Sequence, residues 1–111
     1  MVSGWIGVDL DGTLAEYGTW QGPYHIGKPV PKMVERVKKW LEEGITVKIF
    51  TARVYGDDRT DAIIPIKKWC LEHLGQELEV TCTKDYGMIE LWDDRAIQVI
   101  PNTGVRVDGK E

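Results

Sequence analysis

The sequence has no long hydrophobic run, few cysteines and no excess of basic residues, and each absence excludes a class of protein. No apolar stretch approaches the roughly 20 residues that a membrane-spanning helix needs. A basic segment followed by an apolar one, which marks a secretory signal, is also missing, so we expect a cytoplasmic protein. The formal net charge of -4 argues against a general nucleic-acid binder, although it permits action on a nucleic-acid end.

Cys70 and Cys82 are the only cysteines, and they do not form a CxxC pair. We interpret both as reduced packing residues, with a disulfide or a metal pair as the alternative. The chain of 111 residues suffices for one compact domain, 1–111, and hardly for two. It contains no internal repeat and no low-complexity segment.

Short apolar strands alternate with amphipathic helices. Apolar residues at three- and four-residue steps predict helices over 31–43 and 62–74, and Pro65 is expected in the first turn of the second. Strands are predicted over 5–10, 45–51, 78–83, 88–94 and 96–100. The alternation predicts an α/β three-layer sandwich around a mostly parallel five-stranded sheet. A Pro-Asn-Thr-Gly turn predicts a hairpin over 101–107.

Acidic and polar residues follow the predicted strands at their carboxyl ends, where open parallel sheets bind ligands. They are Asp9, Asp11, Thr51, Lys84, Asp93 and Asp94. Residues two apart in a strand point the same way, so Asp9 and Asp11 can face one ligand. Clustered carboxylates are costly to bury without a cation, and oxygen ligands suit Mg²⁺. The sequence therefore predicts a magnesium site at this edge.

Four segments resemble, in order, the motifs of the haloacid dehalogenase-like (HAD) phosphatase superfamily. They are "DLDGTLA", "FTAR", a lysine after the third strand and "WDDR", and the resemblance covers residues 6–100. It implies a Rossmann-like core and a Mg²⁺-dependent phosphatase that acts through an aspartyl-phosphate. It also implies an open site with no cap domain, because 12–30 has room only for a flap and 83–88 for nothing.

The resemblance gives each acidic residue a role. Asp9 would be the nucleophile, and Asp11 would protonate the leaving oxygen and then deprotonate the attacking water. Asp93 would bind Mg²⁺ together with Asp9 and the carbonyl of Asp11. Asp94 would bind a water on the metal or orient Lys84. Lys84 would balance charge between the nucleophile and the phosphoryl group.

The phosphoryl group would be held by neutral groups. Thr51 would donate a hydrogen bond to a phosphoryl oxygen, supported by the amide of Ala52. Gly12 would let the backbone turn so that its amides approach the phosphate. For the lysine, Lys67 and Lys68 are rivals, but their place inside a predicted helix makes them poorer candidates.

Two loops should flank the phosphate and select the substrate. They are the flap 15–28 and the loop 54–60, and together with Arg53 they contribute Trp20, Tyr24 and Arg59. These side chains could stack on a base and pair with further phosphates. We therefore favour a nucleotide or a nucleic-acid 3′-phosphate over a sugar phosphate. A homo-oligomer remains an option, because a second subunit could supply the lid.

Two other functional classes stay open. A receiver-type phosphoacceptor also clusters aspartates, a threonine and a lysine on a parallel sheet. Its acceptor usually ends the third strand, whereas here that strand ends in "TCT" and no acid follows before Asp85. A non-catalytic phosphate-binding module would bind metal without hydrolysis. At the residue level, a self-capping Asp-Gly turn and a merely solvated polar loop over 55–60 are the simpler alternatives.

Overall fold

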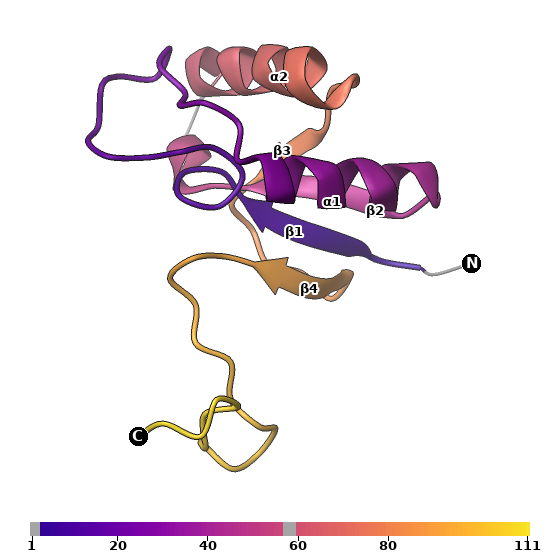
Figure 1. The fold of residues 1–111 in the computed structure, drawn as a ribbon, viewed down its shortest axis with the longest axis vertical. Coiled ribbons are helices and arrows are strands. Elements are labelled where there is room, and N and C mark those ends of the chain that lie inside the picture. The colour runs from indigo at the N-terminus through magenta and orange to yellow at the C-terminus, as the bar shows by residue number, and fades with distance from the viewer. Residues whose placement is uncertain (1–2, 57–59) are drawn as a thin grey trace.

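Four parallel strands form one sheet in a computed structural model of the chain, which describes residues 3–56 and 60–111 (Figure 1). The α/β class and the parallel pairing predicted from the sequence are confirmed. The elements in chain order are β1 (Trp5–Asp9), α1 (Pro31–Glu42), β2 (Thr46–Phe50), a 3₁₀ helix η1 (Ala52–Val54), α2 (Thr60–Leu74), β3 (Glu79–Thr81) and β4 (Met88–Trp92).

The order across the sheet is β3-β2-β1-β4, so the prediction of five strands is wrong for the described residues. Residues 96–100 do not join the sheet. Instead Val99 pairs with Arg106 in an antiparallel bridge, and the amide of Ile100 donates to the carbonyl of Val105 at 2.7 Å. The hairpin predicted at the Pro-Asn-Thr-Gly turn is thereby confirmed, and it uses the strand that the sheet was expected to contain.

Both helices cover the same face of the sheet, so the predicted three-layer sandwich is also wrong for the described residues. Ile6 and Val8 of β1, together with Val47 and Ile49 of β2, form one core with side chains of α1 and α2. The two crossovers, from β1 to β2 and from β2 to β3, step in the same direction. Right-handed connections then place both helices on one side. The link from β3 to β4 contains no helix that could cover the other side.

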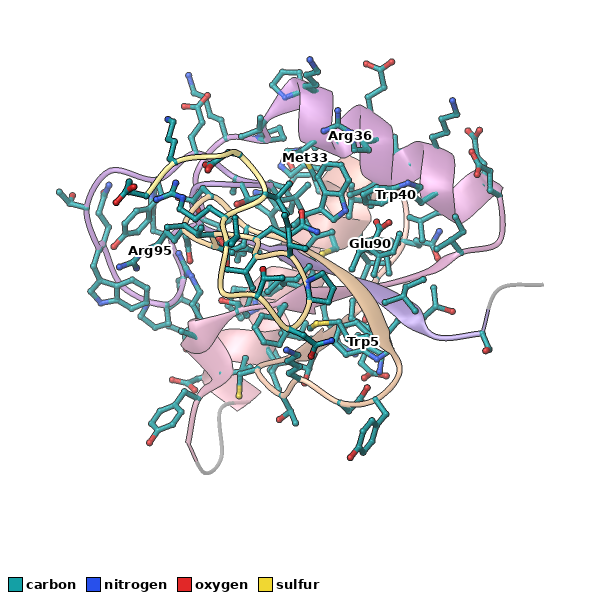
Figure 2. The ribbon with its side chains drawn as sticks, turned by 90° about the horizontal axis from the view of Figure 1, so that it is seen from below. Trp5, Met33, Arg36, Trp40, Glu90 and Arg95 are labelled. Carbon is teal, nitrogen blue, oxygen red and sulfur yellow. The ribbon has the colours of Figure 1, made fainter. Side chains whose placement is uncertain are left out.

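Trp5 covers part of the face without helices. Figure 2 shows it on the side of the sheet opposite to Met33 and Trp40 of α1. The ring is buried beside Gly7, where an added Cβ would lie 3.0 Å from Trp5 Cζ3. Lys48 Nζ lies 4.6 Å from the ring centroid, and the indole N–H donates to Asp85 at 2.9 Å. One tryptophan thus does locally what a second helical layer would otherwise do.

The helix bounds agree with the sequence to within one or two residues. Helix α2 begins at Thr60 rather than at residue 62, so Pro65 lies inside the helix and not in its first turn. That placement costs one backbone hydrogen bond, since proline has no N–H to donate. Cys70 is buried in the core as predicted, whereas Cys82 is exposed, and both thiols are free. Within the described residues, neither helix has the length and apolar character to cross a bilayer.

Candidate functional site

A cavity of about 880 Å³ lies at the carboxyl ends of the strands. It brings together eight of the residues singled out from the sequence, namely Asp9, Asp11, Trp20, Thr51, Ala52, Arg53, Asp93 and Asp94. Tyr17, Phe50, Tyr55 and Arg95 also line it. The ends of β1, β2 and β4 meet here because β1 is central and the other two strands flank it in parallel. The fold therefore places the expected polar groups around one open space.

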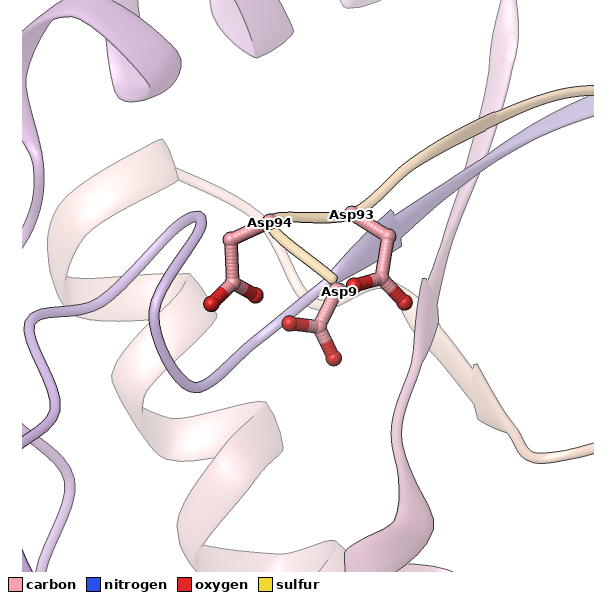
Figure 3. Close-up of side chains that lie close together, drawn as sticks. All are labelled: Asp9, Asp93 and Asp94. Atoms are coloured by element: carbon pink, nitrogen blue, oxygen red, sulfur yellow. The ribbon is translucent and has the colours of Figure 1, made fainter. Parts of the chain in front are cut away.

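Three carboxylates form an acidic cluster at the ends of β1 and β4. Asp9, Asp93 and Asp94 each offer an oxygen, and these oxygens all lie within 4.8 Å of one another (Figure 3). The adjacency of the two parallel strands brings them together, although Asp9 and Asp93 are 84 positions apart in the chain. Hard oxygen donors at this spacing are the ligand type that Mg²⁺ and Ca²⁺ prefer.

The electrostatics of the cluster call for a positive charge. Burial raises the pKa of Asp9 from 3.8 to about 7, and a hydrogen bond with Asp94 and the charges of Asp93 and Asp94 add to the rise. The hydroxyl of Thr13 acts in the opposite direction. Without a cation, the cluster retains a proton near neutral pH. The residues present therefore fit a divalent cation in both donor chemistry and charge.

Thr13 joins the two sides of the cluster, and the sequence interpretation had given it no role. Its hydroxyl lies 3.3 Å from Asp9 Oδ2 and 3.1 Å from Asp94 Oδ1, and it accepts a hydrogen bond from the amide of Asp94 at 2.9 Å. The neighbouring Gly12 has φ +92°, and a Cβ there would lie 2.6 Å from Asp94 Oδ2. The Gly-Thr pair of the "DGTL" string thus fixes the position of Asp94.

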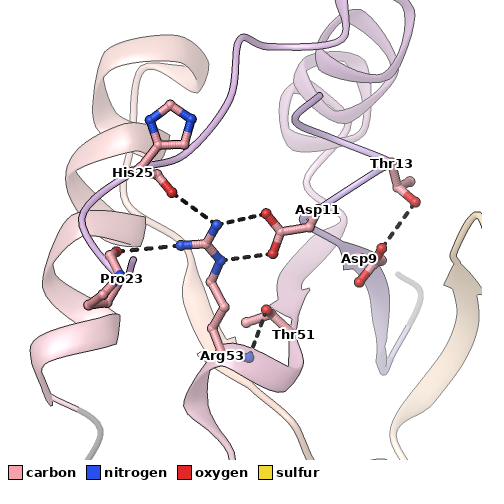
Figure 4. Close-up of polar contacts among 7 residues, drawn as sticks. All are labelled: Asp9, Asp11, Thr13, Pro23, His25, Thr51 and Arg53. Carbon is pink, nitrogen blue, oxygen red and sulfur yellow. Dashed lines mark hydrogen bonds and ion pairs between the residues drawn. The ribbon is translucent and has the colours of Figure 1, made fainter. Parts of the chain in front are cut away.

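Asp11 is held by a bidentate ion pair with Arg53 (Figure 4). Nε and Nη2 of Arg53 each donate to one carboxylate oxygen at 2.8 Å. The same guanidinium donates to the carbonyls of Pro23 at 3.4 Å and His25 at 3.0 Å, and lies 4.8 Å from the centroid of the Trp20 ring. Only 6% of the Arg53 side chain is exposed. The sequence assigned Arg53 to the substrate, whereas here its donors serve Asp11 and the flap.

Thr51 is positioned as the sequence predicted, at the end of β2 and facing the cavity. The residue is 3% exposed, and its hydroxyl oxygen accepts a hydrogen bond from the amide of Arg53 at 3.1 Å. Its own amide donates to the carbonyl of Thr81, which fixes the backbone at that point. The hydroxyl hydrogen is left to donate to a ligand oxygen in the cavity.

The candidate lysine does not reach the same group of residues. Lys84 is exposed after β3 and is not among the residues that line the cavity. Strand β3 is the edge strand beyond β2, so its end lies two strands away from Asp9. Among the described residues, the cations that line the cavity are Arg53 and Arg95, and the sequence interpretation had considered Arg95 only as the partner of an Asp-Asp turn. Arg59, predicted to bind substrate, lies outside the described residues.

The fold and the cavity together define an α/β protein with an acidic cavity at the carboxyl edge of a parallel sheet. No family model matches the chain, and no curated protein matches it significantly. A solved structure described as that of a conserved protein coded by a locus from Bacteroides thetaiotaomicron is similar to it. The identity is 25%, the TM-score is 0.58, and the match covers 90% of this chain and 83% of the other. The likeness supports the arrangement of the fold, and that description names no activity.

Proposed function

We propose that the chain is a Mg²⁺-dependent phosphatase of the HAD superfamily that acts through an aspartyl-phosphate. The observation that carries the proposal is the meeting of Asp9, Asp93 and Asp94 with Thr51 around one cavity. These residues come from segments that resemble the superfamily's motifs in the right order. Phosphoryl transfer requires a nucleophile, a metal site and a group that donates a hydrogen bond to a phosphoryl oxygen.

The three carboxylates would hold Mg²⁺, with the carbonyl of Asp11 as a further ligand. The bound ion would neutralise charge on the phosphoryl oxygens and on Asp9. Asp9 then attacks phosphorus through a carboxylate oxygen, the bond from phosphorus to the substrate oxygen breaks, and Asp11 gives that oxygen its proton. Thr51 donates its hydroxyl hydrogen to a phosphoryl oxygen during this step. Water then attacks the acyl phosphate and loses a proton to Asp11, which releases inorganic phosphate and restores the Asp9 carboxylate.

The pairing of Asp11 favours a second candidate function. Both carboxylate oxygens of Asp11 accept hydrogen bonds from Arg53, so neither is free to carry the proton that a general acid delivers. Phosphatase turnover needs this pair to open. If it stays closed, the chain is a phosphoacceptor or a phosphate-binding module that uses Asp9 and the acidic cluster without turnover.

For the substrate we propose a nucleotide or a nucleic-acid 3′-phosphate. Tyr17, Trp20 and Tyr55 surround the cavity with aromatic surface on which a base can stack. Arg95 lines the cavity and makes no ion pair with any described side chain, so it can pair with a further phosphate. An open cavity also admits a phosphate carried on a bulky molecule.

The deciding experiment counts phosphate released per chain with Mg²⁺, from nucleotides, 3′-phosphorylated oligonucleotides and a generic aryl phosphate. Many phosphates per chain are expected from the parent and from Asp61→Asn, an exposed carboxylate at the start of α2. Asp9→Asn should lose turnover while keeping its circular dichroism spectrum. Near-normal release from Asp9→Asn contradicts the proposal.

The same assay separates the alternatives. If the phosphate of the substrate is labelled, a phosphoacceptor takes up at most one labelled phosphate per chain and keeps it on the protein. A phosphate-binding module binds Mg²⁺ but neither becomes labelled nor releases phosphate.

A further inference from the structure

The C-terminal arm, residues 96–111, extends away from the rest of the molecule (Figure 1). Every residue of the arm is exposed except Arg106, which is partly buried and pairs with Asp108 at 2.9 Å. The backbone hydrogen bonds of the arm join arm residues to one another, such as Val107 to Gln98 at 2.9 Å. Five aliphatic residues nevertheless lie on it with 44–58% of their surface exposed, namely Ile97, Val99, Ile100, Val105 and Val107.

The hairpin in the arm has apolar side chains on both faces. The bridge between Val99 and Arg106 places Val99 and Ile97 on one face. Ile100, Val105 and Val107 then point to the other face. An isolated two-stranded hairpin is at best marginally stable in water, and one with two apolar faces needs a surface to pack against. Within 3–56 and 60–111, no backbone hydrogen bond joins the arm to the rest of the chain, and the five side chains stay 44–58% exposed.

Strand β4 offers a surface of the matching kind. It lies at the edge of the sheet and pairs only with β1 among the described residues. Ile89 and Leu91 of β4 are 48% and 37% exposed. An open edge with apolar side chains is a template for a further strand. The hairpin of the arm therefore lacks a sheet to pack on, and the edge of β4 lacks a neighbouring strand.

The arm cannot easily reach the edge of its own β4. Only 93–95 separate β4 from the arm, and this segment is tied to the acidic cluster. The amide of Asp94 donates to the Thr13 hydroxyl, and the amide of Arg95 donates to Asp93 Oδ1 at 2.8 Å. A tight reversal back along β4 would move Asp94 away from the Thr13 hydroxyl that holds it. A second copy can present its β4 to the arm without that cost.

We propose that two copies of the chain exchange arms, so that the hairpin of each lies along β4 of the other. The seven aliphatic residues of the arm and β4 are each 37–58% exposed. Because one face of each hairpin rests on β4, a two-fold exchange removes part of this surface from water twice, and the backbone paired along both β4 edges adds to it; a specific interface needs about 1,000 Å² in total. The same patch is used twice because the interface is isologous.

Sedimentation equilibrium of the 111-residue chain tests the exchange. The parent should have twice the 12.6 kDa mass of one copy at micromolar concentration. Val99→Glu with Val105→Glu, one residue on each face of the hairpin, should sediment as one copy with an unchanged circular dichroism spectrum. The matched control is Ile64→Glu with Leu71→Glu, which are 60% and 53% exposed on α2, and it should stay dimeric.

Three results would overturn the exchange: a parent of single-copy mass at every concentration, an arm variant that remains dimeric, or a control variant that dissociates. A cross-link then tests the geometry, in a background with Cys82→Ser. Chains with Ile97→Cys and chains with Ile89→Cys should form a mixed disulfide on oxidation. As a control, the same Ile97→Cys chains are mixed with chains that carry Gln76→Cys. If the disulfide to Ile89→Cys forms no faster than the disulfide to Gln76→Cys, the arm does not dock on β4.

Discussion

The metal-free protein should lose stability as the pH rises from about 4.5 to 8, because Asp9 lies among other carboxylates. The pKa of Asp9 is about 7 in the folded chain, against 3.8 as the ordinary value. Between these values the folded state holds a proton that the unfolded state has released, so a rise in pH favours unfolding. The contribution is fully present below about pH 4 and is lost as the pH passes through 7.

The structure sets the size of this loss. A shift of about three pKa units corresponds to about 4 kcal/mol if it acts in full. Asp9 is only partly buried at the mouth of an open cavity, so solvent and salt screening reduce the loss to about 1–2 kcal/mol. For a domain of this length, that is a fall in Tm of roughly 5–10 °C.

Urea denaturation in the presence of EDTA measures the effect for the parent, Asp9→Asn and Asp61→Asn. The parent and Asp61→Asn should lose stability across this range, and Asp9→Asn should lose much less, because asparagine does not titrate. Saturating Mg²⁺ should restore the stability of the parent most strongly near pH 8, the upper end of this range. An equal slope in Asp9→Asn and the parent would refute the assignment of the buried proton to Asp9.

Three further outcomes are expected. Mg²⁺ should raise the Tm of the parent but not of Asp93→Ala in thermal melts, since a ligand of the native state stabilises it by mass action; an equal rise in both would place the ion elsewhere. Arg53→Ala should destabilise the fold by about 2–3 kcal/mol in urea titrations, because it leaves the Asp11 carboxylate without its partner, and Arg53→Lys should recover part of this; no loss would show that the ion pair adds nothing. Gly12→Ala should cost about 2 kcal/mol or more and weaken Mg²⁺ binding in titration calorimetry, because φ +92° and the closeness of Asp94 both exclude a side chain; unchanged affinity would mean that Gly12 does not position Asp94.

Local patterns predicted the elements but not the partners that they find. The helix over 31–43 and the strand over 5–10 were predicted from local sequence, and their bounds agree with the structure within one residue. Residues 96–100 have the same apolar character as a sheet strand, and they do form a β pairing. Which strand they pair with depends on where the chain points after Asp94, and no local pattern contains that information.

For the site, too, the sequence predicted which residues share an edge of the sheet but not how all of them pair. Asp9, Thr51 and Asp93 were predicted to meet because they follow strands that share one edge, and the cavity contains all three. The pair between Asp11 and Arg53 joins charged residues that are 42 positions apart. The sequence alone cannot distinguish an arginine that pairs with a carboxylate of the same chain from one that binds a ligand.

Arg53 couples the position of the flap to the pairing of Asp11. Its guanidinium holds the Asp11 carboxylate on one side and the backbone carbonyls of Pro23 and His25 on the other. Any ligand that draws the guanidinium away releases both at once, because no described side chain takes its place. The flap and the Asp11 carboxylate are therefore released together, and a ligand that competes for an arginine, as a phosphate does, would release both.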